Sequence, residues 1–361
     1  TLDSEYSWDD VLPLIRRQEI RWGDSTYGVS FGSPQFVLSY RADLFEDWGL
    51  QPPETWDAYQ ELLDKIDTRF AEDPDNQLAA TAEPYGENWA ARILLARAAA
   101  SARHRSQYST LFHFTSMKPH INRKPFVRAL EQLLEAARAQ PNRLDATPAE
   151  TSQAILSGQS VMAISWPSAA RPSTASQGDL RIGFAPLPGS YETYSHADDQ
   201  WQPKSDTDDL RVPLLGISGR IGAVCRRSRQ PQQAREMLLW LTSLEQSGRV
   251  SAKSPWTTVF RNSQRNQAGA WVESELTSVA GQYFDVVDQA QTSATYFLMP
   301  RLPGADRYMK VLDDGVREAI RTDADPEMIL NQVAGGWESL TEELGFEKQR
   351  EAYLRSLGLQ P

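Results

Sequence analysis

Apolar residues recur at helical spacing over several stretches of the chain. The clearest case follows Thr55, where one face of a predicted helix consists of Trp56, Tyr59, Leu62, Leu63 and Ile66. The same pattern predicts further helices that start at Asn88, Pro125, Thr147, Gln230, Asp306 and Asp325, with another around residues 270–290. The chain is therefore expected to be rich in amphipathic helices.

Short apolar runs between these helices predict strands. Residues 160–166 (SVMAISW) suit a buried strand, and residues 181–189 form a second run that ends in a Pro/Gly turn. Residues 25–41 contain two β-rich pieces, and residues 214–225 resume strand character. Residues 190–210 are polar and acidic, so an exposed loop is expected there. Strands that alternate with helices over this length indicate an α/β protein.

Local chemistry specifies two helix boundaries. Gly49 follows a short helical run and accepts the left-handed cap conformation without a steric cost from Cβ. Thr147 caps a helix in which Glu150 can complete a capping box, and Gly158 ends that helix. These boundaries depend only on neighbouring residues.

The charge balance restricts the classes of partner. Lys and Arg total 37 and Asp and Glu total 48, which gives a net charge of −11. This charge repels phosphate backbones and no long basic cluster offsets it, so nucleic acid is not an expected partner. No apolar run reaches the length of a membrane span. The single cysteine, Cys225, lies in an apolar run and is expected to be buried.

The usual signatures of catalysis and metal binding are missing from the sequence. The four histidines, His104, His113, His120 and His196, lack the spacing of metal ligands. The sequence contains no phosphate-binding glycine loop, dinucleotide fingerprint or serine nucleophile elbow. No cofactor, metal or catalytic residue is therefore expected. Two carboxylates that act on a glycoside remain an alternative, because such residues can lie far apart in a chain.

Aromatic residues are the unusual feature, with 11 Trp and 12 Tyr. Trp89, Trp166 and Trp256 stand at the ends of predicted elements rather than inside them. A tryptophan in such a place can stack on the C–H face of a sugar ring, although filling a gap in the core is the commoner role of a single tryptophan. Three others occupy apolar helical positions and are assigned to the core: Trp56, Trp240 and Trp337.

Residues 27–66 (YGVSFGSPQFVLSYRADLFEDWGLQPPETWDAYQELLDKI) resemble a signature of bacterial extracellular solute-binding proteins of ABC importers. The similarity is to the sugar-binding, maltose-binding-protein-like group. Further blocks follow in the family's order, from residues 154–168 (AILSGQSVMAISWPS) to residues 324–340 (ADPEMILNQVAGGWESL). The resemblance covers nearly the whole chain.

The resemblance implies an α/β fold of the periplasmic-binding-protein type II class, with two lobes joined by a multi-crossing hinge. The first lobe is expected at 1–30 and 216–283, and the second at 31–215 and 284–361. In the family a long segment of the first lobe precedes the block that begins at Tyr27. The first lobe is therefore expected to be N-terminally incomplete, in a mature or trimmed chain.

The resemblance also implies a function. The protein would capture a small ligand, a sugar or oligosaccharide, in the interlobe cleft by domain closure and deliver it to an ABC permease. It would be periplasmic or extracellular, without a span of its own, and lipid-anchored through a segment ahead of Thr1. An enzyme with cleft carboxylates and a non-transport sensor or scaffold of the same fold are the alternatives.

Candidate ligand contacts fall at the predicted edges of the cleft. The hinge would supply Ser33 and Gln35 at the Gly-Ser-Pro break, where backbone groups are free. The second lobe would supply a helix N-terminus with free N–H groups, and Trp166 occupies the family's stacking position. The full set of candidates is Ser33, Gln35, Glu87, Asn88, Trp89, Trp166, Trp256, Arg261, Arg301 and Tyr308. An ordinary interlobe ion pair is an equal alternative for Arg301.

Overall fold

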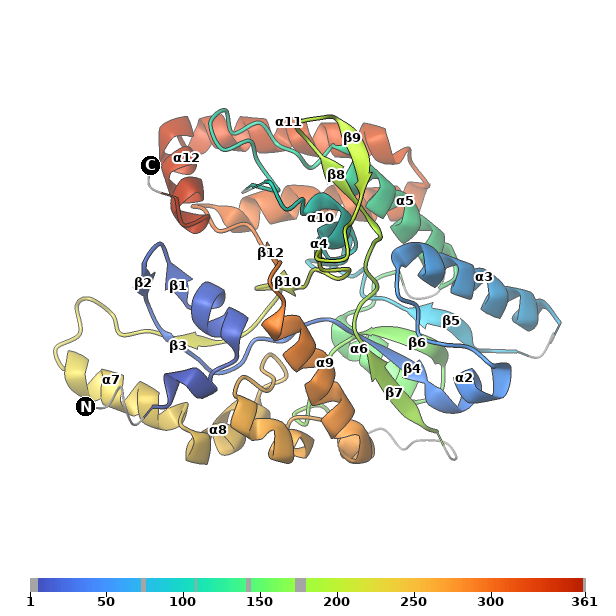
Figure 1. Cartoon of the computed structure of the whole chain (residues 1–361), viewed down its shortest axis with the longest axis horizontal. Helices are drawn as coiled ribbons and strands as arrows, with labels where there is room; N and C mark the ends of the chain where they lie inside the picture. The colour runs from blue at the N-terminus through green and yellow to red at the C-terminus, as the bar shows by residue number, and fades with distance from the viewer. Residues whose placement is uncertain (1–5, 73–75, 108, 141–143, 173–179, 360–361) are drawn as a thin grey trace.

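The computed structural model describes residues 6–72, 76–107, 109–140, 144–172 and 180–359 (Figure 1). The expected start of the first lobe at residues 1–5 lies outside this part of the chain. The α-helices of the described residues are α2 (Ala42–Trp48), α3 (Trp56–Ala71), α4 (Ala90–Ala102), α5 (Lys124–Arg138), α6 (Pro148–Leu156), α7 (Pro231–Leu241), α8 (Leu244–Val250), α9 (Ala280–Thr292), α10 (Ala305–Thr322), α11 (Pro326–Leu344) and α12 (Phe346–Ser356). They alternate with strands, so the predicted α/β class is confirmed.

The strands are short. They are β1 (Arg21–Trp22), β2 (Ser25–Thr26), β3 (Val29–Ser30), β4 (Val37–Arg41), β5 (Ala79–Ala82), β6 (Ser160–Ser165), β7 (Ile182–Ala185), β8 (Glu192–Ser195), β9 (Gln200–Pro203), β10 (Leu214–Leu215), β11 (Ile221–Gly222) and β12 (Phe297–Leu298). Single-turn and irregular helices complete the chain at η1 (Trp8–Asp10), η2 (Ile15–Glu19), η4 (Ser251–Lys253), η5 (Asn262–Ala270) and η6 (Ser274–Val279).

The main sheet has four strands in the order β5-β6-β4-β7. β6 is parallel to β5 and antiparallel to β4, and β4 is antiparallel to β7. Val37 lies opposite Ser165, so the start of β4 and the end of β6 meet at one edge of the sheet. All six residues of β6 are buried, as its unbroken apolar run predicts.

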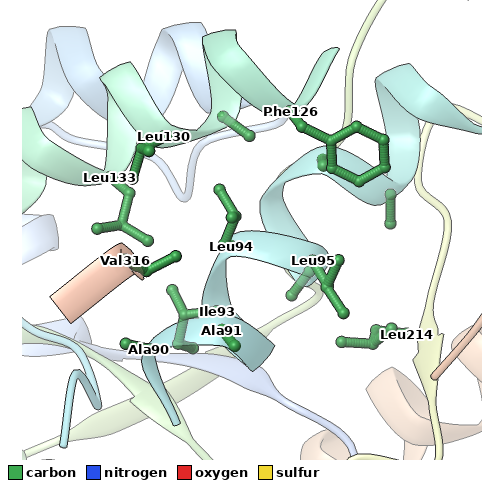
Figure 2. Close-up of a cluster of buried hydrophobic side chains, with 14 of the residues drawn as sticks. Ala90, Ala91, Ile93, Leu94, Leu95, Phe126, Leu130, Leu133, Leu214 and Val316 are labelled. Carbon is green, nitrogen blue, oxygen red and sulfur yellow. The ribbon is translucent and has the colours of Figure 1, made fainter. Parts of the chain in front are cut away.

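Each face of this sheet packs on a separate hydrophobic core. Leu38 and Ile164 point into a core that they share with α3, α4, α5, α10 and α11. Val37 and Ala163, on the other face, join a second core with residues from 6–29 and 239–287. Figure 2 shows the first core, where Leu94 and Leu95 of α4 lie among Phe126, Leu130 and Leu133 of α5.

Two short pairings mark where the chain passes between these cores. β3 is antiparallel to β11, and β10 is parallel to β12. The amide of Phe31 donates to the Arg220 carbonyl at 2.8 Å, so residues 28–33 run beside residues 218–222. In Figure 1, α10, α11 and α12 lie above β10 and β12, and α7, α8 and α9 lie below them. The two-lobe architecture that the sequence predicts is confirmed.

The two helix boundaries predicted from neighbouring residues are confirmed. Gly49 ends α2 with a φ of 65°. Thr147 and Glu150 form the expected capping box at the start of α6. Among the described residues, no helix combines the length and the apolar character that crossing a membrane requires.

Three local expectations were wrong. Residues 190–210 are not simply a loop, because β8 and β9 form a hairpin whose Thr193 donates through Oγ1 to the Ser101 carbonyl of α4 at 3.2 Å. Trp240 is 56% exposed rather than in the core, because α7 buries little beyond Leu239. Cys225 is also exposed, since its segment follows β11 as a turn.

Candidate ligand-binding site

Three of the candidate tryptophans come together in one aromatic cluster with Phe36. We call Phe36, Trp89, Trp166 and Trp256 the tryptophan cluster. Phe36 immediately precedes β4 and Trp166 immediately follows β6, so the pairing of Val37 with Ser165 places both rings at one sheet edge. Trp89 stands at the N-cap of α4, and Trp256 follows η4.

The rings of the cluster contact one another. The ring centroids of Trp89 and Trp256 are 6.1 Å apart and their planes differ by only 2°. Trp166 lies 5.5 Å from Trp89 and 6.4 Å from Trp256, and Phe36 lies 5.9 Å from Trp166. Trp166 is fully buried and Trp89 is 8% exposed, whereas Trp256 is 37% exposed. Trp256 therefore carries the accessible part of the aromatic surface.

The cluster bridges segments that are far apart in the sequence. The indole N–H of Trp166 donates to the Pro255 carbonyl at 3.0 Å, which ties the sheet edge to the loop before Trp256. Gly32 allows the same loop to approach the crossing segment. Its φ is +114°, and a Cβ there would meet the Thr258 carbonyl oxygen at 2.3 Å.

Arginine side chains lie over the tryptophan rings. The guanidinium of Arg92 is 5.1 Å from the Trp89 ring, and that of Arg220 is 6.0 Å from the Trp256 ring. Arg92 also donates through Nε to the Ile217 carbonyl at 2.9 Å, which connects α4 to the segment after β10. Guanidinium groups that rest on aromatic faces combine an apolar surface with hydrogen-bond donors, as recognition of a hydroxylated ring requires.

The N-terminus of α4 is bonded within the protein. Asp313 of α10 accepts hydrogen bonds from the amides of Asn88 at 2.8 Å and Ala91 at 3.0 Å. The prediction that these N–H groups are free for a ligand is wrong, because a distant carboxylate caps the helix. Burial raises the pKa of the Asp313 carboxyl, and the two amide donors partly offset this rise because they stabilise its charged form. Glu87 and Asn88 are themselves exposed, and Asn88 has a φ of 69°.

Ser33 and Arg301 converge on Glu19. Ser33 donates through Oγ to the Ser218 carbonyl at 3.2 Å, and Arg301 donates through Nη1 to the Gln18 carbonyl at 2.8 Å. Burial raises the pKa of Glu19 to about 7, while Ser33, the Gly216 amide and Arg301 favour its charged form. This polar group lies beside the crossing segments.

The remaining candidates lie elsewhere. Arg261 is fully buried, and its Nη2 donates to the Thr242 carbonyl at 2.9 Å. Tyr308 is fully buried in the first core, where its hydroxyl is 3.0 Å from Thr341 Oγ1. Gln35 lines a cavity that borders the cluster at Phe36. The structure brings none of these three into the tryptophan cluster, and a ligand contact by any of them stays a prediction.

Comparison with known proteins decides the family. Residues 2–275 match the family described as bacterial extracellular solute-binding protein. The chain belongs to this family. The resemblance that the sequence blocks indicated is confirmed. No curated protein is significantly similar to this solute-binding protein in sequence.

Solved structures share the fold of this solute-binding protein. An ABC transporter solute-binding protein from Agrobacterium radiobacter K84 in complex with ribitol is 16% identical, with a TM-score of 0.67 over 94% of this chain and 77% of that one. A protein from Agrobacterium vitis S4 with bound D-mannitol is 17% identical, with a TM-score of 0.65 over 95% and 80%. Maltose-bound MalE3 of T. maritima is 16% identical, with a TM-score of 0.61 over 94% and 78%. At these identities the likeness shows the fold.

Sequence reasoning missed several residues of the site. Arg92 lies three residues after Trp89 on α4, a spacing that places both on one helix face and that could have drawn attention to it. Phe36 and Arg220 carry no comparable signal. Asp313 lies 222 residues after Ala91, the residue whose amide it accepts from, so only the tertiary structure reveals its role at the N-terminus of α4.

Proposed function

We propose that this solute-binding protein captures a sugar or polyol between two lobes and hands it to an ABC permease. One observation carries the proposal. Trp89 and Trp256 lie face to face across segments that are far apart in the sequence, with a guanidinium over each ring. Parallel aromatic faces flanked by hydrogen-bond donors suit a ring that has C–H faces and a hydroxyl rim.

The proposed lobes follow the chain order of the family. Residues 1–30 and 216–283 form the first lobe, and residues 31–215 and 284–361 form the second. Trp256 then belongs to the first lobe and Trp89 to the second, so their contact is an interlobe contact. A ligand enters when the lobes separate, and it stabilises the closed form by replacing this contact with two of its own.

Solved proteins of the same fold support the choice of ligand class. Their bound ligands are ribitol, D-mannitol and maltose, all polyhydroxylated molecules. The proposed direct contacts are Trp89 and Trp256 through their ring faces, with Arg92, Arg220, Glu87 and Asn88 as hydrogen-bonding groups. Trp166 supports the other two rings from behind, and Ser33 lies at the hinge. The permease recognises the closed form of the protein. A lipid anchor ahead of Thr1 holds the protein at the membrane.

The test measures affinity for ribitol, D-mannitol, maltose and raffinose by calorimetry and thermal shift. Replacement of the Trp256 ring, by Trp256→Ala, removes one stacking face worth on the order of 1 kcal/mol, so the Kd should rise several-fold. Trp240→Ala is the matched control, because Trp240 is also an exposed tryptophan of the proposed first lobe. Equal affinity in the two variants, or no saturable binding to any of the four, would overturn the proposal.

A catalytic role is the competing proposal, and product analysis separates the two. Incubation of the pure protein with maltose and raffinose should leave both intact, because binding by lobe closure includes no covalent step. Release of monosaccharides by the wild-type protein would favour the carbohydrate-active alternative. Family membership and the fold are those of binding proteins rather than enzymes.

A further inference from the structure

A cavity of about 410 Å³ borders the tryptophan cluster at Phe36 and lies beside the segments that connect the two cores. Its walls come from residues 35–37 before and within β4, residues 186–188 after β7, residues 209–214 that lead into β10, and residues 286–294 at the end of α9. This volume is within the roughly 300–1,000 Å³ typical of small-molecule sites.

Most of the cavity wall is apolar. Aliphatic and proline side chains face it from every segment, including Leu187, Val212, Pro213, Leu214 and Val286. Among the described residues that line it, Phe36 supplies an aromatic ring but no tryptophan or tyrosine does, so the cavity lacks the pair of parallel rings that the proposed sugar site offers. The cavity therefore suits a compact apolar body better than a sugar.

Two residues on this wall, Gln35 and Arg211, have buried polar side-chain atoms without a hydrogen-bond partner, and the amide of Gln35 lacks both of its partners. Gln35 is only 4% exposed, and neither its Nε2 nor its Oε1 has a hydrogen-bond partner among the described residues. A buried amide without partners costs roughly 1–3 kcal/mol, so an occupant that both donates to Oε1 and accepts from Nε2 removes that penalty. This amide is independent of the cavity's shape as an indication of a ligand.

Charged side chains of opposite sign, Asp209 and Arg211, line the cavity. Asp209 lines the cavity, and its Oδ2 accepts from Ser293 Oγ at 3.0 Å and from the Thr295 amide at 2.7 Å. These bonds hold a carboxylate at the cavity edge. Arg211 offsets the charge of Asp209, so the choice of a neutral occupant rests on Gln35: a carboxylate would leave Gln35 Oε1 without a donor.

We propose that this cavity is a second small-molecule site, for a neutral ligand with an apolar body and a carboxamide or hydroxyl group that pairs with Gln35. The ligand touches residues 35–37, 209–214 and 292–294, each of which leads into a connection between the two cores. Its binding is therefore placed to influence lobe closure, whatever ligand the tryptophan cluster takes.

Benzamide is the probe, because its ring fits an apolar cavity and its carboxamide complements Gln35. Methyl-labelled protein is titrated with benzamide and, separately, with benzoate, and methyl NMR signals are followed. Saturable benzamide shifts are expected at Val212, Leu214 and Val286, with benzoate binding at least ten-fold more weakly. Gln35→Leu keeps the volume and removes both hydrogen bonds, so the benzamide Kd should rise roughly ten-fold.

A second variant fills the cavity. Ala290 of α9 lines the wall, so Ala290→Phe should abolish the benzamide shifts, whereas Ala197→Phe at the exposed β8–β9 turn should leave them unchanged. Benzamide shifts that persist in Ala290→Phe, shifts that map elsewhere, or benzoate binding as tight as benzamide would each overturn the site. The wild-type titration alone decides if Gln35→Leu does not fold. Failure here leaves the proposed sugar site standing, since no measurement in this set uses a sugar.

Discussion

Truncation of Trp166 should damage stability rather than ligand affinity alone. The sequence pattern placed this residue on a ligand-facing surface, for which Trp166→Ala would leave the fold intact. In the structure its side chain is fully buried, its ring contacts Phe36, Trp89 and Trp256, and its N–H donates to Pro255. Removal of so large a buried side chain typically costs about 3–5 kcal/mol.

Two further variants separate the contributions. Trp166→Phe keeps an aromatic ring and removes the hydrogen bond to the Pro255 carbonyl, so a loss of about 1–2 kcal/mol is expected. Trp240→Ala removes an exposed ring of the same size, and its effect should stay within about 0.5 kcal/mol. The expected loss of stability therefore follows how much buried contact each variant removes, and not the mere loss of a tryptophan.

Urea unfolding followed by far-ultraviolet circular dichroism measures these differences. The midpoint should fall in the order Trp240→Ala, Trp166→Phe and Trp166→Ala, with the slope m unchanged. A midpoint for Trp166→Ala equal to that of the wild type would show that the ring does not pack as described. A larger loss for Trp240→Ala than for Trp166→Ala would reverse the burial assignments of both tryptophans.

Two other properties follow from buried charge and capping. Burial, with Arg123 nearby, lowers the pKa of His120 to about 3 and that of His196 to about 4, so below pH 6.5 the unfolded chain binds more protons than the folded one. The free energy of unfolding from urea titrations should therefore fall as the pH drops from 6.5 towards 4, by up to about 1.4 kcal/mol per pH unit for His120, and His120→Gln should reduce this dependence. Asp313→Leu leaves the Asn88 and Ala91 amides without their acceptor and should cost about 2 kcal/mol in the same assay; an effect no larger than that of the exposed Asp314→Leu would refute the capping role.

The sequence by itself determined the features that depend on near neighbours. The capping box of Thr147 and Glu150, the left-handed Gly49 and the buried strand at residues 160–165 are each specified within a few residues. The order of such blocks along the chain was enough to indicate the family and its two-lobe α/β fold. Hydrophobic period also predicted α10 and α11, because their apolar faces are continuous.

Only the tertiary structure decided which residues meet. Trp166 and Trp256 are 90 positions apart, and their contact depends on how the loop after η4 approaches the sheet edge. Helical spacing misassigned Trp240 as buried, and the strand-end position and the family resemblance misassigned Trp166 as accessible, because neither says which element covers a given ring. The same limit hid Asp313 at the α4 N-terminus. Contacts between distant segments depend on the packing of whole elements, and that packing forms both the tryptophan cluster and the Gln35 cavity, which meet at Phe36.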